Sequence, residues 1–245
     1  MKITFLGTSH GVPSAERFCS AALLETGGRA YLIDGGAPVA DLLIRRGIPY
    51  ERIRAVFATH MHSDHTFGLP LLCSLANWKF RDSSFDVFLT EDAGIDAFRQ
   101  LLLVGDGKLD ETRIRLRKTS PGVFYADDLI TVTAVPTRHI DNGARPSYAY
   151  LIDAEDKRVV FTGDMHYGDA ADFPRQAMES PSDAIVCEMA HFGPETILPI
   201  VEKCPTKQIL FNHVWFDYER SMAAIREAGK TRAVRAVGDG DVVEL

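Results

Sequence analysis

The sequence predicts an α/β fold of two similar halves, in which two β-sheets pack together and helices lie outside them. Hairpins of similar plan occupy residues 20–34 and 147–164. A short apolar strand and then a helix-compatible stretch follow each hairpin. Layered α/β folds often reach 245 residues in one unit, so we expect residues 1–245 to form a single domain.

The first half opens with a strand-like run over residues 2–6. Residues 20–24 and 31–33 then flank Thr26-Gly27-Gly28, which is a turn signal between two strands. The apolar run 54–57 leads into a histidine-rich loop, and residues 69–80 have the composition of a helix. A further helix is predicted over 92–103, ended by Gly105.

The second half repeats this plan. A β-branched strand over 130–135 is expected to end at Pro136, and residues 147–152 and 159–163 form a hairpin around Glu155-Asp156-Lys157. The apolar run 183–186 leads to Glu188 and His191 and is followed by a helix-compatible stretch over 195–203. Another short apolar strand, 208–211, precedes His213.

The charge distribution argues against a protein that depends on nucleic-acid backbone contacts. The net charge is −7, whereas such proteins usually carry a basic face. One basic run places Arg113, Arg115 and Arg117 on one face of a strand. We interpret that face as solvated, with a nucleic-acid stripe as the alternative.

The cysteines and the chain start indicate a cytoplasmic protein. Cys19, Cys73, Cys187 and Cys204 are scattered and form no Cys-x-x-Cys pair, so neither a disulfide framework nor a zinc ribbon is expected. We find no signal-peptide pattern and no apolar stretch long enough to span a bilayer, so no membrane partner is expected.

The segment His60-Met61-His62-Ser63-Asp64-His65 predicts a metal site. Imidazole suits zinc, iron and manganese, and the aspartate adds an anionic oxygen. Extended backbone points His60, His62 and Asp64 to one side, while His65 begins a helix. Four ligand-type residues among six positions are improbable in an ordinary polar loop, so we predict that the segment serves two adjacent ions.

Three further candidates lie just beyond apolar strands: His139, Asp164 and His213. Each taken alone is equally compatible with an ordinary loop histidine or turn aspartate. Taken together, in this order, they predict the remaining ligands of a two-metal centre.

This arrangement resembles the metallo-β-lactamase superfamily, whose pattern is His-x-His-x-Asp-His, a single His, Gly-Asp and a late His. Residues 5–14, Phe-Leu-Gly-Thr-Ser-His-Gly-Val-Pro-Ser, further resemble the start of the ribonuclease Z-like branch, as do Thr137-x-His139 and residues 161–164. The resemblance covers nearly the whole chain. It implies a four-layer αβ/βα sandwich of two similar halves, the metallo-β-lactamase fold.

The resemblance also implies roles for individual residues. His60, His62 and His139 would hold one ion, and Asp64, His65 and His213 the other, with Asp164 bridging. Asp34 matches a position that supports the site from behind the ligands. His191 matches the family's proton donor, which acts with the aspartate corresponding to Asp64, although Phe192 stands where a serine or threonine commonly follows closely.

A dinuclear metal-dependent hydrolase is the function we expect. Zinc is the first expectation for the ions, with manganese or iron as alternatives. Two divalent ions exceed the charge of the two carboxylates, which favours an anionic substrate, and a metal-bridging hydroxide is the expected nucleophile. We therefore predict a phosphodiesterase. The alternatives are a carboxylic ester, lactone or thioester hydrolase and an RNA endonuclease of ribonuclease Z type.

The expected substrate is a small-molecule or single-stranded phosphodiester. In the tRNA-processing relatives a basic, Gly/Pro-rich insertion lies between the positions of His139 and Asp164, and only a hairpin fits in this interval here. We therefore do not expect tRNA as the main substrate. Relatives of this branch are often dimers, which makes a homodimer an expectation. Trp215 and Phe216 follow His213 and either wall the pocket or simply pack as aromatic residues do.

Overall fold

The computed structural model describes residues 1–215 and 217–245. Within these residues the strands form two seven-stranded sheets. Sheet A has the order β14 (Val242–Glu244), β1 (Lys2–Gly7), β2 (Ala21–Thr26), β3 (Arg29–Ile33), β4 (Ile53–Phe57), β5 (Phe85–Leu89) and β6 (Ile114–Lys118). Sheet B has the order β13 (Val234–Ala236), β12 (Ile209–Val214), β11 (Ala184–Met189), β10 (Lys157–Phe161), β9 (Ser147–Ala154), β8 (Ile130–Thr137) and β7 (Gly122–Ala126).

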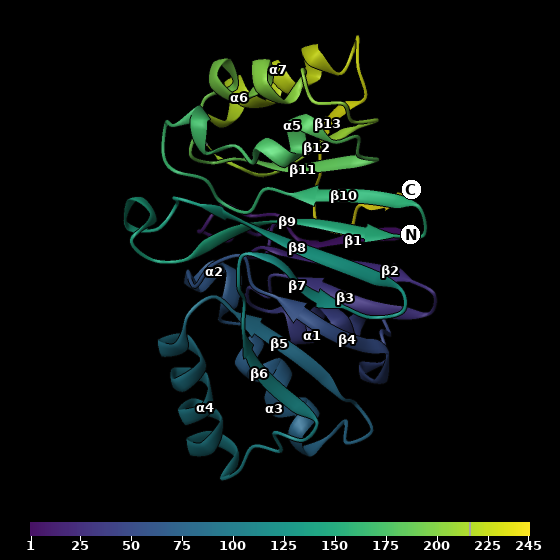
Figure 1. The fold of residues 1–245 in the computed structure, drawn as a ribbon, viewed down its shortest axis with the longest axis vertical. Coiled ribbons are helices and arrows are strands. Elements are labelled where there is room, and N and C mark those ends of the chain that lie inside the picture. Colours follow the sequence, from purple (N-terminus) through teal and green to yellow (C-terminus); the bar gives the residue numbers. More distant parts are fainter. Residues whose placement is uncertain (216) are drawn as a thin grey trace.

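Helices cover the outer face of each sheet (Figure 1). On the side of sheet A they are α1 (Val39–Arg45), α2 (Ser63–Thr66), α3 (Leu69–Trp78) and α4 (Asp92–Asp106). On the side of sheet B they are α5 (Arg175–Glu179), α6 (Pro194–Val201) and α7 (Tyr218–Ala228). Short 3₁₀ turns are η1 (Tyr50–Arg52), η2 (Asp141–Gly143) and η3 (Ala170–Asp172). Across the described ranges, no helix has both the length and the apolarity needed to cross a membrane.

The two halves share one topology, as the recurring hairpin pattern predicted. In sheet A the β2–β3 hairpin is antiparallel, and β3 to β6 are then parallel. In sheet B the β9–β10 hairpin is antiparallel, and β10 to β13 are parallel. The fold is therefore the predicted four-layer sandwich. Because the parallel strands in each half end at one edge, the loops that follow them gather there.

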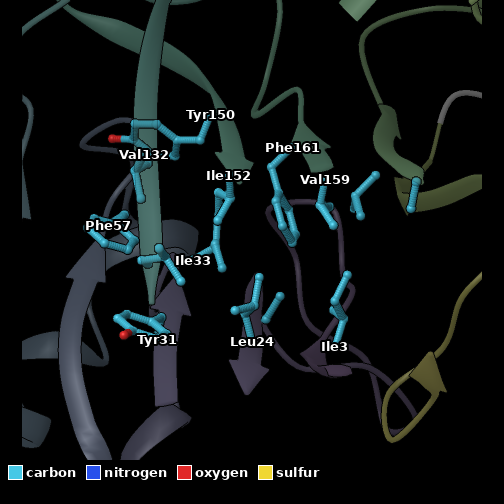
Figure 2. Packing of buried hydrophobic residues seen from close by; sticks show 14 of the residues in the cluster. Ile3, Leu24, Tyr31, Ile33, Phe57, Val132, Tyr150, Ile152, Val159 and Phe161 are labelled. Atoms are coloured by element: carbon cyan, nitrogen blue, oxygen red, sulfur yellow. The ribbon is translucent and has the colours of Figure 1, made fainter. Parts of the chain in front are cut away.

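The inner faces of the two sheets form the central core, which Figure 2 shows with Leu24 and Ile33 of sheet A facing Ile152 and Phe161 of sheet B. An aromatic cluster around Phe57 extends this core to the end of β4, with ring centres 5.1 Å from Tyr125 and 6.2 Å from Tyr150. The Tyr150 hydroxyl donates a hydrogen bond to the Ala58 carbonyl at 2.6 Å. The core thereby fixes the backbone just before the histidine-rich loop.

Two predicted boundaries were wrong. Helix α4 continues through Gly105 to Asp106, because the left-handed residue that ends it is Gly107, with φ of 73°. Strand β8 continues through Pro136 to Thr137. Strand β7 pairs with β8 only as far as Ala134, so Pro136 lies beyond it, where no ladder bond to β7 is required.

The basic run lies on and just before β6, at the edge of sheet A, and each of its arginines is ion-paired. Arg115 and Arg117 both form ion pairs with Asp86, and Arg113 pairs with Asp110. This matches the interpretation of a solvated strand face. No unpaired basic stripe is left there for nucleic acid.

Candidate metal centre

The seven predicted ligand residues come together at one edge of the sandwich. His60 and His62 follow β4, while Asp64 and His65 lie in α2. The other three come from the opposite sheet: His139 follows β8, Asp164 follows β10, and His213 lies near the end of β12. Their assignment as ligands remains a prediction, but the convergence on which it depends is present in the structure.

Three imidazole nitrogens define the first cluster. His60 Nε2 lies 3.0 Å from His62 Nδ1, and His139 Nε2 lies 3.1 Å from the same atom. Two nitrogens each about 2.0–2.1 Å from one zinc ion, at angles of about 90–110°, would be about 2.9–3.4 Å apart. The separations therefore fit three ligands on one ion.

The second cluster contains Asp64, His65 and His213. Asp64 Oδ2 lies 3.2 Å from His65 Nε2 and 3.6 Å from His213 Nε2. Within the described part of the chain, His65 Nε2 is a buried nitrogen with no hydrogen-bond partner of good geometry. A bound cation would satisfy that atom, whereas leaving it unpaired is costly.

Asp164 stands between the two clusters. Its Oδ2 atom is 3.3 Å from His213 Nε2 and 3.5 Å from His65 Nε2 on one side. On the other side the same oxygen is 3.8 Å from the Nε2 atoms of His60 and His139. One carboxylate thus faces both ligand groups, which is the position that a bridging ligand requires.

Asp34 and Thr59 orient the ligands from behind. Asp34 Oδ2 lies 2.8 Å from His65 Nδ1, and its Oδ1 accepts hydrogen bonds from Thr59 N at 2.7 Å and Thr59 Oγ1 at 3.0 Å. Thr59 Oγ1 in turn lies 3.0 Å from His60 Nδ1. Bonds of this kind to the outer ring nitrogen fix the tautomer and orientation of a ligating histidine. Asp34 therefore lies behind His65, and its supporting role stays a prediction; Thr59 was not predicted.

The electrostatics of the site also fit cations. Burial lowers the pKa of His60, His62 and His139, which leaves them as neutral imidazoles. Burial opposes the ionised form of Asp64, but the neighbouring His65 outweighs it and lowers the pKa of Asp64 to about 2. Burial opposes the charged forms of His65 and His213, but Asp164 outweighs it and raises their pKa values, so these two positions hold positive charge that a bound cation would replace. Neutral imidazoles and ionised carboxylates are the protonation states in which these side chains bind metals, so His65 and His213 would each release a proton on binding.

Gly163 is required by the turn that presents Asp164. Its φ is 58°, and a Cβ atom added there would lie 2.7 Å from the Tyr148 carbonyl oxygen, a backbone atom that cannot move aside cheaply. We expect Gly163→Ala to lower the free energy of unfolding by about 1–3 kcal/mol, because it adds strain in the left-handed region. Urea unfolding would measure this. Gly105→Ala is the control: it lies within α4 with open space around it and should be neutral or stabilising.

His191 lies beside the ligands and is held by Glu188. The ring centres of His191 and His139 are 4.6 Å apart, and His191 Nδ1 is 2.9 Å from Glu188 Oε1. Glu188 is fully buried and also accepts backbone hydrogen bonds from Met165, Ala190 and His191. Burial opposes the charged form of His191, but Glu188 and Asp164 outweigh it and raise its pKa to about 9. The buried Glu188 carboxylate thus favours the protonated form of His191, whose ring lies beside His139.

A cavity of about 280 Å³ opens over the ligand groups. Asp64, Asp164, His191 and His213 line it, together with His10 and Trp215. Phe216, which the sequence placed beside Trp215, lies outside the described residues. His10 comes from the loop after β1, where a histidine between polar and glycine residues has no strand or helix periodicity to orient it.

Much of this sequence matches a known family model and curated proteins. A family model described as Anti-Pycsar protein Apyc1 matches residues 1–191. Ribonuclease Z of Anoxybacillus flavithermus is 35% identical over 159 residues, or 64% of this chain and 49% of that relative. Ribonuclease Z of Listeria innocua is 32% identical over 161 residues, or 64% and 51% of the two chains. The chain thus spans about half the length of the curated relatives it matches.

Solved structures share the whole architecture. The metallo-beta-lactamase fold protein YhfI of Bacillus subtilis superimposes with a TM-score of 0.78 at 21% identity, over 99% of both chains. Human tRNase Z, short form, gives a TM-score of 0.74 at 19% identity and covers 100% of this chain and 99% of its own. At these identities the likeness establishes the fold. With the family model, it follows that this chain belongs to the Anti-Pycsar protein Apyc1 family, in the ribonuclease Z-like branch of the metallo-β-lactamase superfamily.

Proposed function

We propose that this protein is a metal-dependent hydrolase that cleaves a phosphodiester at a centre of two divalent ions. The observation that carries the proposal is the position of Asp164 Oδ2 between two three-residue ligand groups, within 3.8 Å of a histidine nitrogen in each. Zinc is the metal expected first, with manganese or iron as alternatives. Relatives named ribonuclease Z and a structural neighbour described as a diphosphatase support hydrolysis of phosphate esters.

His60, His62 and His139 would hold one ion, Asp64, His65 and His213 the other, and Asp164 would contact both. Bound ions would lower the pKa of water toward about 7 and stabilise charge on the reacting phosphate. Two ions carry four positive charges and the two carboxylates return two, so the site as a whole attracts an anion. His191 lines the same cavity as Asp64, Asp164 and His213, so a phosphate bound at these residues would lie beside it.

His191 is the candidate proton donor to the leaving oxygen. Its side chain is about one quarter exposed on the cavity side, whereas Glu188 is buried behind it. The hydrogen bond from His191 Nδ1 to Glu188 leaves Nε2 as the nitrogen that can reach a substrate. Asp64 also lines the cavity and would act with His191 on the leaving group.

The substrate we propose is small or single-stranded, for example a cyclic nucleotide-like diester. Between His139 and Asp164 the structure contains only η2 and the β9–β10 hairpin, so no long basic arm is available there to grip a tRNA. RNA cleavage of the ribonuclease Z type remains the second candidate, because relatives of that name are 32–35% identical over the matched region.

The test compares substrates on one preparation. Metal-stripped protein reconstituted with Zn²⁺ or Mn²⁺ should hydrolyse bis-p-nitrophenyl phosphate in preference to a p-nitrophenyl carboxylic ester and a lactone. We expect Asp64→Ala to abolish this turnover, because it removes a ligand of the second group, while the exposed Asp82→Ala leaves it unchanged. Turnover of the ester or lactone alone would overturn the proposal. Cleavage of a precursor tRNA at physiological salt would favour the second candidate.

A further inference from the structure

Trp215 presents an aromatic face beside the metal centre. It lies just beyond β12, two residues after His213, and its side chain is 57% exposed. The His10 ring, from the loop after β1, stacks on it with ring centres 5.0 Å apart and planes 15° apart. One face of the indole is therefore covered by a parallel ring that fixes its orientation, and the exposure of the side chain leaves the other face open.

Trp215 and His10 form a wall shared by two neighbouring cavities. The first is the cavity of about 280 Å³ over the ligand groups. The second, of about 440 Å³, is lined by the same two rings together with Arg17 and Tyr218. A molecule whose phosphate lies at the metal ligands can therefore extend past Trp215 into the second cavity.

Within the described part of the chain, the outer cavity is lined by one cation, Arg17, and one carboxylate, Glu16, which accepts a hydrogen bond from Ser14 and forms no ion pair with Arg17. Arg17 donates a hydrogen bond to the Tyr218 hydroxyl at 2.9 Å, and its guanidinium carbon lies 5.2 Å from the centre of that ring. Among the residues that the structure describes, Arg17 forms no ion pair with a carboxylate. Arg17 thus offers donors to polar or anionic atoms at the outer end of a ligand.

We propose that the open face of Trp215, backed by His10, is the surface on which the nucleobase of the substrate stacks while its phosphodiester lies at the metal centre. Arg17 then contacts polar atoms at the outer end of the nucleotide. This inference rests on the proposed phosphodiesterase function and adds the residue, Trp215, that holds the base of the proposed nucleotide-like substrate. Stacking of a base on an aromatic side chain is sequence-tolerant and changes affinity by about 5- to 150-fold.

Tryptophan fluorescence tests the stacking without turnover. The chain contains two tryptophans, Trp215 and Trp78, which is on α3. In the metal-loaded protein, adenosine 5′-monophosphate should quench the fluorescence of Trp78→Phe, in which Trp215 is the remaining fluorophore, and should not quench Trp215→Phe. Ribose 5-phosphate, which has the phosphate but no base, should quench neither. Quenching that persists in Trp215→Phe, or equal quenching by ribose 5-phosphate, overturns the proposal.

Kinetics test whether Trp215 makes the enzyme prefer a diester that carries a nucleobase. The substrates are thymidine 5′-(p-nitrophenyl phosphate) and methyl p-nitrophenyl phosphate, which release the same leaving group. The kcat/KM for the thymidine ester divided by that for the methyl ester should fall by about 5- to 150-fold in Trp215→Ala, mainly because KM for the thymidine ester rises. This ratio should be largely restored in Trp215→Phe and should not change in Trp78→Ala. An unchanged ratio in Trp215→Ala contradicts the stacking role. If the wild-type protein hydrolyses neither ester, the phosphodiesterase proposal fails, and the fluorescence result still decides whether a base stacks on Trp215.

Discussion

Asp164→Asn is expected to lower phosphodiester turnover by about 10³-fold or more and to leave fewer than two ions per chain. The Asp164 carboxylate faces both ligand groups, so an amide in its place removes one negative charge from between two cations. Two-metal stabilisation of a reacting phosphate amounts to several kcal/mol, and each 1.36 kcal/mol is about tenfold in rate. Elemental analysis and turnover of bis-p-nitrophenyl phosphate measure the two effects.

Asp96→Asn is the matched control, because it makes the same chemical change on the outer surface of α4, where the side chain is 74% exposed. It should retain both metal content and turnover. The folded state of Asp164→Asn should survive, since the amide has nearly the same size and shape as the carboxylate it replaces. Two ions per chain with wild-type turnover in Asp164→Asn would rule out a bridging role for this residue.

His191→Ala is expected to slow hydrolysis of a 3′,5′-cyclic nucleotide by about 10²- to 10⁴-fold, the range for loss of a general acid. The leaving group of that substrate is an alkoxide, which must take up a proton. The p-nitrophenolate ion leaves without one, so hydrolysis of bis-p-nitrophenyl phosphate should fall much less. The comparison of the two substrates therefore isolates proton donation from binding.

His191 also lies close to His139 and Asp164 and could therefore be a metal ligand instead of a proton donor. The metal content of the His191 variant distinguishes these two roles. We expect His191→Ala to retain the metal content of the wild type. Glu188→Gln tests the positioning of the imidazole: it should slow the cyclic nucleotide more than the p-nitrophenyl ester, with KM little changed. Equal losses on both substrates, or loss of an ion, would show that His191 is not a proton donor.

The candidate ligand residues could be named from the sequence because each carries a local signal. His60, His62, Asp64 and His65 lie within six consecutive positions after an apolar strand, and His139, Asp164 and His213 each follow or end such a strand. Strands that run in the same direction within one sheet end at the same edge, so the residues that follow them in that sheet are expected at that edge. Hairpin recurrence likewise predicted the paired sheets, since strand periodicity and turn residues are properties of neighbouring positions.

Contacts between segments far apart in the sequence were decided only by the tertiary structure. Nothing local to Thr59 indicates that it joins Asp34 to His60, and nothing local to Trp215 indicates that His10, 205 positions earlier, stacks against it. The end of α4 is likewise set by Gly107, which adopts the left-handed backbone conformation. The presence of a glycine does not by itself show whether the helix ends at Gly105 or at Gly107. Periodicity and turn chemistry act over a few residues, so the sequence by itself determined the strands, the two-fold plan and the candidate ligands. Their distances, the buried support behind them and the aromatic wall beside them depend on the packing of two sheets, which the chain acquires only when both halves have folded together.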